Sequence, residues 1–294
     1  MILDPLSLKL FVSIVEEGSI AAGAEREHIA ASAVSKRISE LEDVFHTQLL
    51  RRTNRGVEAT DAGITLLQLA RGVLRDMNNI ALQIREYASG VRGLVRLSAN
   101  ISSINQFLPS EIRTFMSAHP QVHVHLEANI SEAIVNAVAE NAADVGVVTM
   151  AAYRNELEFI PYHTDQLIVI TPKEHPLATR RSIKLCDTLD YDFVGLPVGS
   201  ALHNQLIRAA LELDRTPKLR IQVNSFDALC LMVEAGLGIG IVPKGAARPY
   251  LKGLRIRSIA LDEPWATRYL KICVRSLASL PTSARLLVEH LREK

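Results

Sequence analysis

Residues 19–63 read SIAAGAEREHIAASAVSKRISELEDVFHTQLLRRTNRGVEATDAG, and this stretch carries the strongest structural signal in the chain. Apolar residues recur in it at i, i+4, i+7 and i+11, which is the spacing of one face of an α-helix. These residues are Val34, Ile38, Leu41 and Phe45. The sequence therefore predicts an amphipathic helix whose opposite face is free for another role.

The opposite face of this predicted helix begins small and cationic. A helix that enters the major groove of DNA needs short side chains for close approach and donors for base edges and phosphates. Ser32, Lys36 and Ser39 point outward, and Ser35 and Arg37 lie on the flanks. This pattern favours a DNA-contacting face, although three short helices also occur in many folds that bind no DNA.

Two shorter helices and a basic hairpin are predicted around it. A first amphipathic helix breaks at Gly18, and Ser19 is a good N-cap for a second, Ala-rich helix. Downstream, a short strand-turn-strand carries cations placed to hold phosphates beside the groove. These cations are Arg51, Arg52 and Arg55. The signal is local, because residues 1–93 contain 11 Lys and Arg against 12 Asp and Glu.

Several short runs resemble the LysR-type transcriptional regulators. They are Ala33-Val34-Ser35-Lys36-Arg37-Ile38, Leu41-Glu42, Leu49-Leu50-Arg51-Arg52 and Thr60-Asp61-Ala62-Gly63, and the similarity extends over the whole chain. The resemblance implies an N-terminal winged helix-turn-helix, a long linker helix and a two-lobed α/β effector domain of the periplasmic-binding-protein type. It implies double-stranded DNA, a small-molecule effector and RNA polymerase as partners, assembly into homodimers and homotetramers, and no cofactor.

One departure from the family concerns base recognition. The family often has Ser/Thr-Gln at the start of the recognition helix, where this chain has Ala30 and Ala31. Alanine cannot make the bidentate amide contact to adenine that glutamine makes. By position, the family's groove contacts carry over to Ala31, Ser32, Ser35 and Lys36, so the binding mode is expected but the DNA sequence is left open.

A long helix is predicted after Thr60, running without proline over residues 61–88. At 1.5 Å per residue, its length is roughly 40 Å. Apolar residues repeat in an a/d heptad pattern, which favours a two-helix seam over an ordinary amphipathic helix. The predicted dimer residues are Leu67, Ala70, Leu74, Met77, Ala81 and Ile84.

Strands and helices alternate beyond Gly90, which indicates an α/β domain with a parallel sheet. Strands are expected at 95–97, 122–126, 145–148, 167–170, 193–196, 219–223 and 270–274, and a polar loop at 98–105. Helices are expected at 109–118, 132–140, 201–213, 227–235 and 282–292. The expected division is 1–60 for DNA binding, 61–90 for the linker and 91–294 for the effector domain. Resemblance places lobe I at 91–164 and 267–294, and lobe II at 165–266.

Ligands of open α/β sheets bind beyond the carboxyl ends of strands and at helix N-termini. Four such ends carry small polar residues, and free amide groups with the helix dipole favour an anion there. Each residue alone could be a simple helix cap. The predicted effector residues are Asn100, Ser102, Ser103, Thr149, Gly199, Ser200, Asn224 and Ser225, with His203 one turn into a helix.

Signals for catalysis or metal binding are weak. Cys186, Cys230 and Cys273 are scattered, and the nine histidines form no ligand pair. The segment 236–240 lacks the spacing of a dinucleotide-binding loop. The three cysteines are expected to be reduced in the cytosol, and the alternative, a thiol redox switch, would need two of them to be brought close together. No apolar run has the ~18 residues of a membrane span.

Three classes of function therefore stay open. The first is a ligand-responsive transcription factor, which the resemblance favours. The second is a small-molecule binding protein whose N-terminal helices serve only for oligomerisation. The third, an enzyme on the two-lobed fold, has no visible nucleophile and base to support it.

Overall fold

The computed structural model describes residues 3–53, 56–89, 93–149 and 154–293. These residues form two compact units, one made mainly of residues 1–88 and the other mainly of residues 89–294. Each unit has hydrophobic core clusters of its own. Among the helices described, none combines the length and the hydrophobicity that a membrane crossing requires. The separate boundaries expected at 60 and 90 stay predictions.

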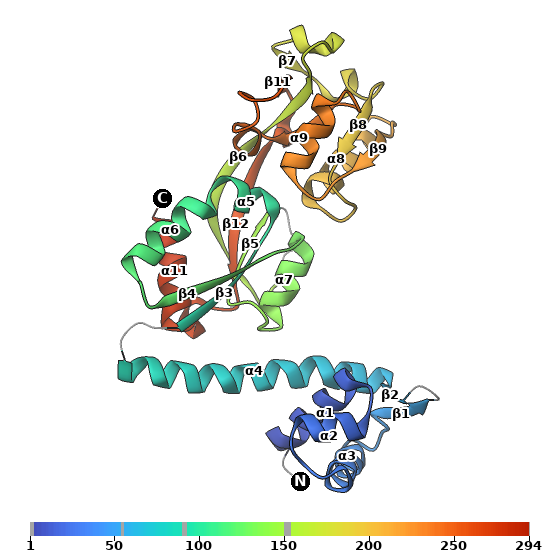
Figure 1. Cartoon of the computed structure of the whole chain (residues 1–294), viewed down its shortest axis with the longest axis vertical. Coiled ribbons are helices and arrows are strands. Elements are labelled where there is room, and N and C mark those ends of the chain that lie inside the picture. The colour runs from blue at the N-terminus through green and yellow to red at the C-terminus, as the bar shows by residue number, and fades with distance from the viewer. Residues whose placement is uncertain (1–2, 54–55, 90–92, 150–153, 294) are drawn as a thin grey trace. The chain divides into compact units, whose positions relative to one another are not determined.

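The first unit is a three-helix domain with a two-stranded hairpin and a long final helix (Figure 1). Its elements are α1 (Pro5–Glu17), α2 (Ile20–Arg26), α3 (Ala31–Phe45), β1 (Leu50–Thr53), β2 (Gly56–Ala59) and α4 (Asp61–Ser89). Leu10, Phe11 and Ile14 of α1 are fully buried with Val34 of α3. The apolar faces of α1 and α3 therefore form the centre of this unit.

Two glycines determine how the hairpin and the first helices approach each other. A β-carbon at Gly23 in α2 would lie 2.9 Å from the backbone of Ile14, so α1 and α2 can cross this closely only with glycine at that position. Gly18 ends α1 in the left-handed conformation, with φ of 66°. Its carbonyl accepts a hydrogen bond from the Val57 amide at 2.8 Å, which ties the hairpin to the α1–α2 turn.

Helix α3 buries the apolar face that its spacing predicts, with one exception. Val34, Ile38 and Leu41 are buried, but Phe45 is 42% exposed. The expectation for Phe45 was wrong because this residue lies in the last turn, beyond the core. His46 then ends the helix with φ of 48°.

The long helix α4 begins as predicted, with the Gly63 amide donating to the Thr60 hydroxyl at 3.0 Å. The predicted seam needs correction at its N-terminal end. Ala70 is only 1% exposed, and Leu67 and Leu74 pack against the same core of the first unit. These residues face the chain's own core because this face of α4 covers α1. The side chains of Ala81 and Ile84 lie outside the described residues.

A different apolar stripe of α4 is exposed. It consists of Leu69, Val73, Met77 and Ile80, spaced by four, four and three residues. Leu69 is 63% and Ile80 is 62% exposed. Residues three and four apart share a helix face, so these side chains form one continuous surface. Met77 is the residue that this stripe shares with the predicted seam.

The second unit contains a mixed eight-stranded sheet and a separate strand pair, with helices around them. Its strands are β3 (Gly93–Ala99), β4 (Val122–Ala128), β5 (Val145–Thr149), β6 (Glu158–Pro172), β7 (Ser182–Ile183), β8 (Asp192–Gly195), β9 (Lys218–Gln222), β10 (Gly240–Pro243), β11 (Ile256–Leu261) and β12 (Thr267–Val274). Its helices are α5 (Ile101–Gln106), α6 (Leu108–Ala118), α7 (Ser131–Ala139), α8 (Ala201–Leu211), α9 (Phe226–Glu234), α10 (Lys244–Ala247) and α11 (Thr282–Arg292).

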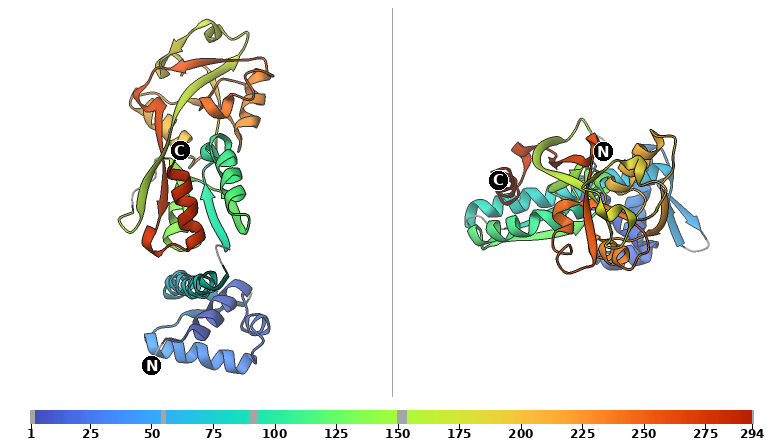
Figure 2. Two further views of the ribbon diagram at one scale, coloured as in Figure 1. Left: turned by 90° about the vertical axis from the view of Figure 1, so that its left-hand side faces the viewer. Right: turned by 90° about the horizontal axis from the view of Figure 1, so that it is seen from above.

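Two lobes share the long strand β6. Its first part pairs with β12 in lobe I, where β3, β4 and β5 complete the sheet. Its last part pairs with β10 and β11 in lobe II. This strand extends through both lobes in the views of Figures 1 and 2. Each lobe has its own apolar core, so the unit is two packed bodies joined by crossing strands.

Two expectations for this unit were wrong. The polar stretch 98–105 is the end of β3 followed by helix α5, because the Asn100 side chain caps α5 by accepting from the Ser103 amide. The sheet is mixed, because β6, β10 and β12 pair antiparallel with their neighbours. Strand β11 and the first half of β6 were not predicted.

Candidate functional site

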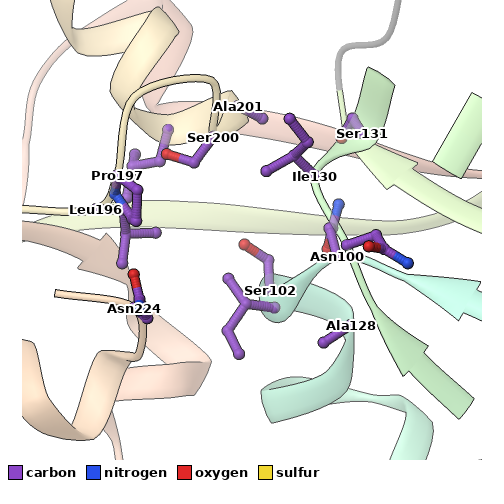
Figure 3. A pocket seen from close by; sticks show the side chains of 13 residues that line it. Asn100, Ser102, Ala128, Ile130, Ser131, Leu196, Pro197, Ser200, Ala201 and Asn224 are labelled. Atoms are coloured by element: carbon purple, nitrogen blue, oxygen red, sulfur yellow. The ribbon is translucent and has the colours of Figure 1, made fainter. Parts of the chain in front are cut away.

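A cavity of about 360 Å³ lies between the two lobes (Figure 3). Lobe I contributes the segments that follow β3 and β4, and lobe II contributes the segment between β8 and α8 and the end of β9. The lining consists of Asn100, Ile101, Ser102, Ala128, Asn129, Ile130, Ser131, Leu196, Pro197, Ser200, Ala201, Leu202 and Asn224. None of these side chains is charged, so in the described residues the lining combines small polar groups with apolar surface.

Thr149, which is fully buried at the end of β5, supports the lobe I wall of the cavity. The Asn100 Nδ2 donates to the Thr149 Oγ1 at 2.8 Å. The Ser131 hydroxyl donates to the Thr149 carbonyl at 3.0 Å. Thr149 therefore positions two lining residues from different helices without itself lining the cavity.

The lobe II wall is built around the start of α8. The Ser200 hydroxyl caps this helix by accepting from the His203 amide at 3.2 Å. Gly199 precedes it with φ of 87°, a conformation that favours glycine, and a β-carbon there would lie 3.3 Å from the Ile130 side chain of lobe I. The first amides of α8 have no partners within the helix, and the helix dipole makes this end favourable for a negative group.

The structure brings together four of the predicted effector residues and gives the others different positions. Asn100, Ser102, Ser200 and Asn224 line the cavity. Ser103 binds the Asn100 carbonyl at 2.8 Å, Ser225 caps α9, and Thr149 and Gly199 support the walls. His203 lies outside this lining, in a much smaller cavity within lobe II that Leu206 and Leu219 also line.

Sequence reasoning missed the second wall of lobe I. Asn129 and Ser131 follow strand β4, and the Asn129 Nδ2 donates to the Ser98 hydroxyl at 3.1 Å. The strand itself was predicted, so the rule for carboxyl strand ends would have found both residues. The apolar members Ile130, Leu196 and Leu202 carried no such signal, because apolar residues near strand ends usually belong to a core.

A second candidate site is the outer face of α3. Ala31, Ser32, Lys36 and Ser39 are exposed, and Ser35 is partly exposed. The Lys36 ammonium lies 3.9 Å from the Glu40 carboxylate, a loose surface pair that leaves it accessible. The predicted small, cationic face is therefore on the surface of the first unit rather than in its core.

Arg37 has a structural role that the sequence did not indicate. Its guanidinium donates to the Asp4 carboxylate at 3.2 Å and to the Ser7 hydroxyl at 3.3 Å. Hydrogen bonds from Ser7, together with this guanidinium, hold the pKa of Asp4 below its usual value. Arg37 thus joins α3 to the start of α1, and its predicted contact with DNA stays a prediction.

The cations of the hairpin follow helix α3 in the sequence. One of them, Arg51, forms an ion pair within the hairpin. The Arg51 guanidinium lies 3.0 Å from the Glu58 carboxylate on the neighbouring strand. Both side chains are exposed, so this pair is weak and can open toward a phosphate. The side chain of Arg52 and the whole of Arg55 lie outside the described residues.

The chain matches two family models and superposes on solved structures. Residues 6–64 match the bacterial regulatory helix-turn-helix proteins of the lysR family, and residues 88–294 match the LysR substrate binding domain. The uncharacterized HTH-type transcriptional regulator YbhD of Escherichia coli (strain K12) is 29% identical over 280 residues, covering 95% of this chain and 87% of that protein.

Two solved structures have the same fold. Full-length CbnR in complex with its target DNA superposes with a TM-score of 0.72 at 21% identity, covering 99% of both chains. The effector binding domain of QuiR in complex with shikimate superposes with a TM-score of 0.62 at 20% identity, covering 69% of this chain and 97% of that one. The predicted fold class, a winged helix-turn-helix followed by a two-lobed α/β domain, is confirmed.

The three thiols differ in their exposure to solvent. Cys186 is exposed, whereas Cys230 and Cys273 are buried in different lobes. Burial raises the pKa of Cys230 to about 11 and that of Cys273 to about 12. Both thiols are therefore protonated at neutral pH, which makes them poor nucleophiles.

We expect Ellman's reagent at pH 8 to modify Cys186 rapidly in the native protein and to reach all three thiols only after unfolding in urea. The physical reason is that the buried thiols are both inaccessible and protonated. Cys186→Ser is the control, and in its native state no thiol should react rapidly with the reagent. Rapid modification of Cys230 or Cys273 in the native variant would contradict this prediction.

Proposed function

This chain is a member of the LysR family of transcriptional regulators, and we propose that it binds promoter DNA as an oligomer and senses a small anionic metabolite in the interlobe cavity. The observation that carries the proposal is the exposed outer face of α3, with Lys36 among short side chains. Helix α3 enters the major groove, and the cations of the hairpin contact the neighbouring phosphates.

Base recognition by this face differs from that by a recognition helix that has glutamine near its start. Ala31 contributes only a methyl group, which suits contact with a thymine methyl. Ser32 and Ser35 offer hydroxyls to base edges or phosphates, and Lys36 offers a charged donor. Affinity then depends on a few phosphate contacts per subunit, since the chain has a formal net charge of only +1.

A second copy of the chain covers the apolar stripe of α4. Leu69, Val73, Met77 and Ile80 expose a continuous apolar surface on a helix of 29 residues. Pairing two such helices removes this surface from water and brings two winged heads together, as two half-sites require. Dimers then associate through their effector domains into a tetramer, an arrangement inherited from the family.

The effector is a small anion that the walls of the interlobe cavity bind together. Its charge is stabilised by the helix dipole and the first amides of α8 rather than by a basic lining residue. Ser102, Ser200 and Asn224 supply hydrogen bonds from both lobes. The cavity of about 360 Å³ is at the lower end of the size range of small-molecule sites.

Effector binding then changes how the DNA-binding heads are presented. Closure of the lobes alters the preferred arrangement of subunits in the oligomer and thereby the bend of the bound DNA. The effector can shift this equilibrium only by the difference between its affinities for the two arrangements. In this proposal the protein acts as a cytoplasmic ligand-dependent switch that RNA polymerase senses at the promoter.

The alternative is a binding protein whose N-terminal helices serve only for oligomerisation. That function would leave the outer face of α3 without a ligand, and it would not require cations beside that face. An enzyme on the same fold finds less support, since the relatives that match the chain are named as transcriptional regulators.

Lys36→Ala is expected to weaken binding to genomic DNA fragments selected by the parent protein, by about tenfold in 0.1 M salt, because one phosphate or base contact is lost. The slope of log K against log salt should fall by about one. Fluorescence anisotropy measures both quantities. Lys252→Ala, an exposed lysine of lobe II, is the control. Equal affinity of Lys36→Ala and the control would remove Lys36 from the DNA interface, whereas a parent protein that selects no genomic fragment would favour the binding-protein alternative.

Leu69→Glu and Ile80→Glu are each expected to lower the oligomeric state, because a charge in an apolar seam has no partner and stays solvated only in the monomer. Sedimentation velocity of the full chain measures the change. Gln68→Glu places the same charge on the neighbouring face of α4 and should assemble like the parent. Unchanged assembly of both stripe variants would exclude this seam.

Small carboxylates, including shikimate, are expected to raise the unfolding temperature of the full chain in a concentration-dependent way, since a ligand that binds the folded state stabilises it. Methyl shikimate, which lacks the charge, should raise it less than the acid does. Ala201→Trp fills the cavity and should abolish the shift while DNA binding persists. If the ester and the acid acted equally, the cavity would not select an anion.

A further inference from the structure

A buried ion pair lies where the two lobes are joined. Arg268 of β12 and Asp165 of β6 are direct partners in the register of these strands. The Arg268 side chain is 1% exposed and the Asp165 side chain 3%. The Arg268 Nε donates to the Asp165 Oδ1 at 2.8 Å, and its Nη2 donates to the other carboxylate oxygen.

One end of this pair reaches the interlobe cavity. The Arg268 Nη2 also donates to the Ser102 hydroxyl oxygen at 3.2 Å, and Ser102 lines the cavity (Figure 3). Because that oxygen accepts from a guanidinium, the hydroxyl hydrogen of Ser102 points away from Arg268. Ser102 can therefore donate this hydrogen to an acceptor on a ligand.

The other end of the pair reaches lobe II through Gln106. The Gln106 Nε2 donates to the Asp165 Oδ2 at 2.8 Å and to the Ser102 carbonyl at 3.1 Å. Its carboxamide lies against Gly245 of α10, where a β-carbon would overlap the Gln106 Oε1. Helices α5 of lobe I and α10 of lobe II therefore meet at this side chain.

Stability is a weak explanation for an ion pair in this position. Replacing a buried pair by apolar residues of similar size is often neutral or stabilising, because two charges must be taken out of water. The pair does, however, fix one geometry of the crossing strands through a bidentate contact. A geometric role is also consistent with its third contact, which leads to the cavity rather than into either core.

We propose that Arg268 is a positioning residue that orients the Ser102 hydroxyl toward the effector and, through Asp165 and Gln106, couples occupancy of the cavity to the strands that join the lobes. This role rests on the proposed function of the cavity. A ligand acceptor at Ser102 tightens the Ser102–Arg268–Asp165 contacts. It thereby restrains the two crossings, which are the parts of β6 and β12 that pass between the lobes. A ligand of the same size without an acceptor does not.

The test uses a tethered probe, so that it depends neither on DNA nor on the natural effector. Asn224→Cys in a Cys186→Ser background gives an exposed thiol at the cavity, since Cys230 and Cys273 are buried. Sulfonatoethyl methanethiosulfonate attaches an anionic acceptor there, and propyl methanethiosulfonate attaches an apolar group without one. Hydrogen exchange of the full chain measures opening of the amides at 164–168 and 266–270.

The sulfonate is expected to slow exchange at both crossings by about two- to tenfold, the range that one added hydrogen bond gives, and the propyl group to have no such effect. Ser102→Ala and Arg268→Lys should abolish the difference while both reagents still attach. Lysine keeps the charge beside Asp165 but cannot make the fork-shaped contact. A failure of DNA or shikimate binding would leave this result unchanged, so the two proposals fail separately.

The coupling is overturned if the two reagents act alike in the parent, or if Arg268→Lys and Ser102→Ala respond as the parent does. Should Arg268→Lys not fold, the double variant Arg268→Met with Asp165→Leu removes both charges and leaves neither one unpaired. It should fold and show no difference between the reagents. A difference of the parent's size in this variant also overturns the proposal.

The link to lobe II has its own matched pair of variants. Gly245→Ala adds a methyl group that displaces the Gln106 carboxamide from Asp165, so exchange at the crossings should rise in the absence of any reagent. Gly253→Ala adds the same group where no atom lies within 4 Å, and it should exchange like the parent. Equal exchange in both variants would remove Gln106 from the coupling.

Discussion

The pairing of β6 with β12 is the constraint on which the effector domain depends. Both strands enter the lobe I sheet, and β6 continues into lobe II, where β10 and β11 pair with it. Movement of one lobe relative to the other must therefore bend or twist these strands. The cavity walls belong to different lobes, so the same strands set the distance between the groups that line the cavity on its two sides.

The interlobe cavity is lined mainly by residues at the ends of helices and strands rather than in their middles. Asn100 and Ser200 are N-caps, and Asn224 follows a strand. Such residues satisfy the first amides of a helix and can at the same time offer oxygen and nitrogen atoms to a small molecule. This double use gives the cavity polar atoms on both walls although none of its described lining side chains is charged.

The DNA-binding unit separates its tasks between the two faces of α3. Val34, Ile38 and Leu41 hold the helix to the core, so residues on the outer face can differ without loss of the fold. Arg37 lies between the faces and serves the fold by binding Asp4. Helix α4 makes the same separation, with Ala70 inside and Leu69 outside, one residue apart along the chain.

Local spacing was sufficient to predict most helices, the basic hairpin and the polar strand ends, because caps and 3.6-residue periodicity depend on neighbours in sequence. It could not predict which apolar stripe of α4 faces the core, since Leu67 and Leu69 are equally apolar and the choice depends on where α1 lies. The ion pair between Asp165 and Arg268 could not be predicted from local spacing either, because these residues are 103 positions apart in the sequence. Contacts between distant segments exist only after the strands have found their register, and that register is a property of the folded chain.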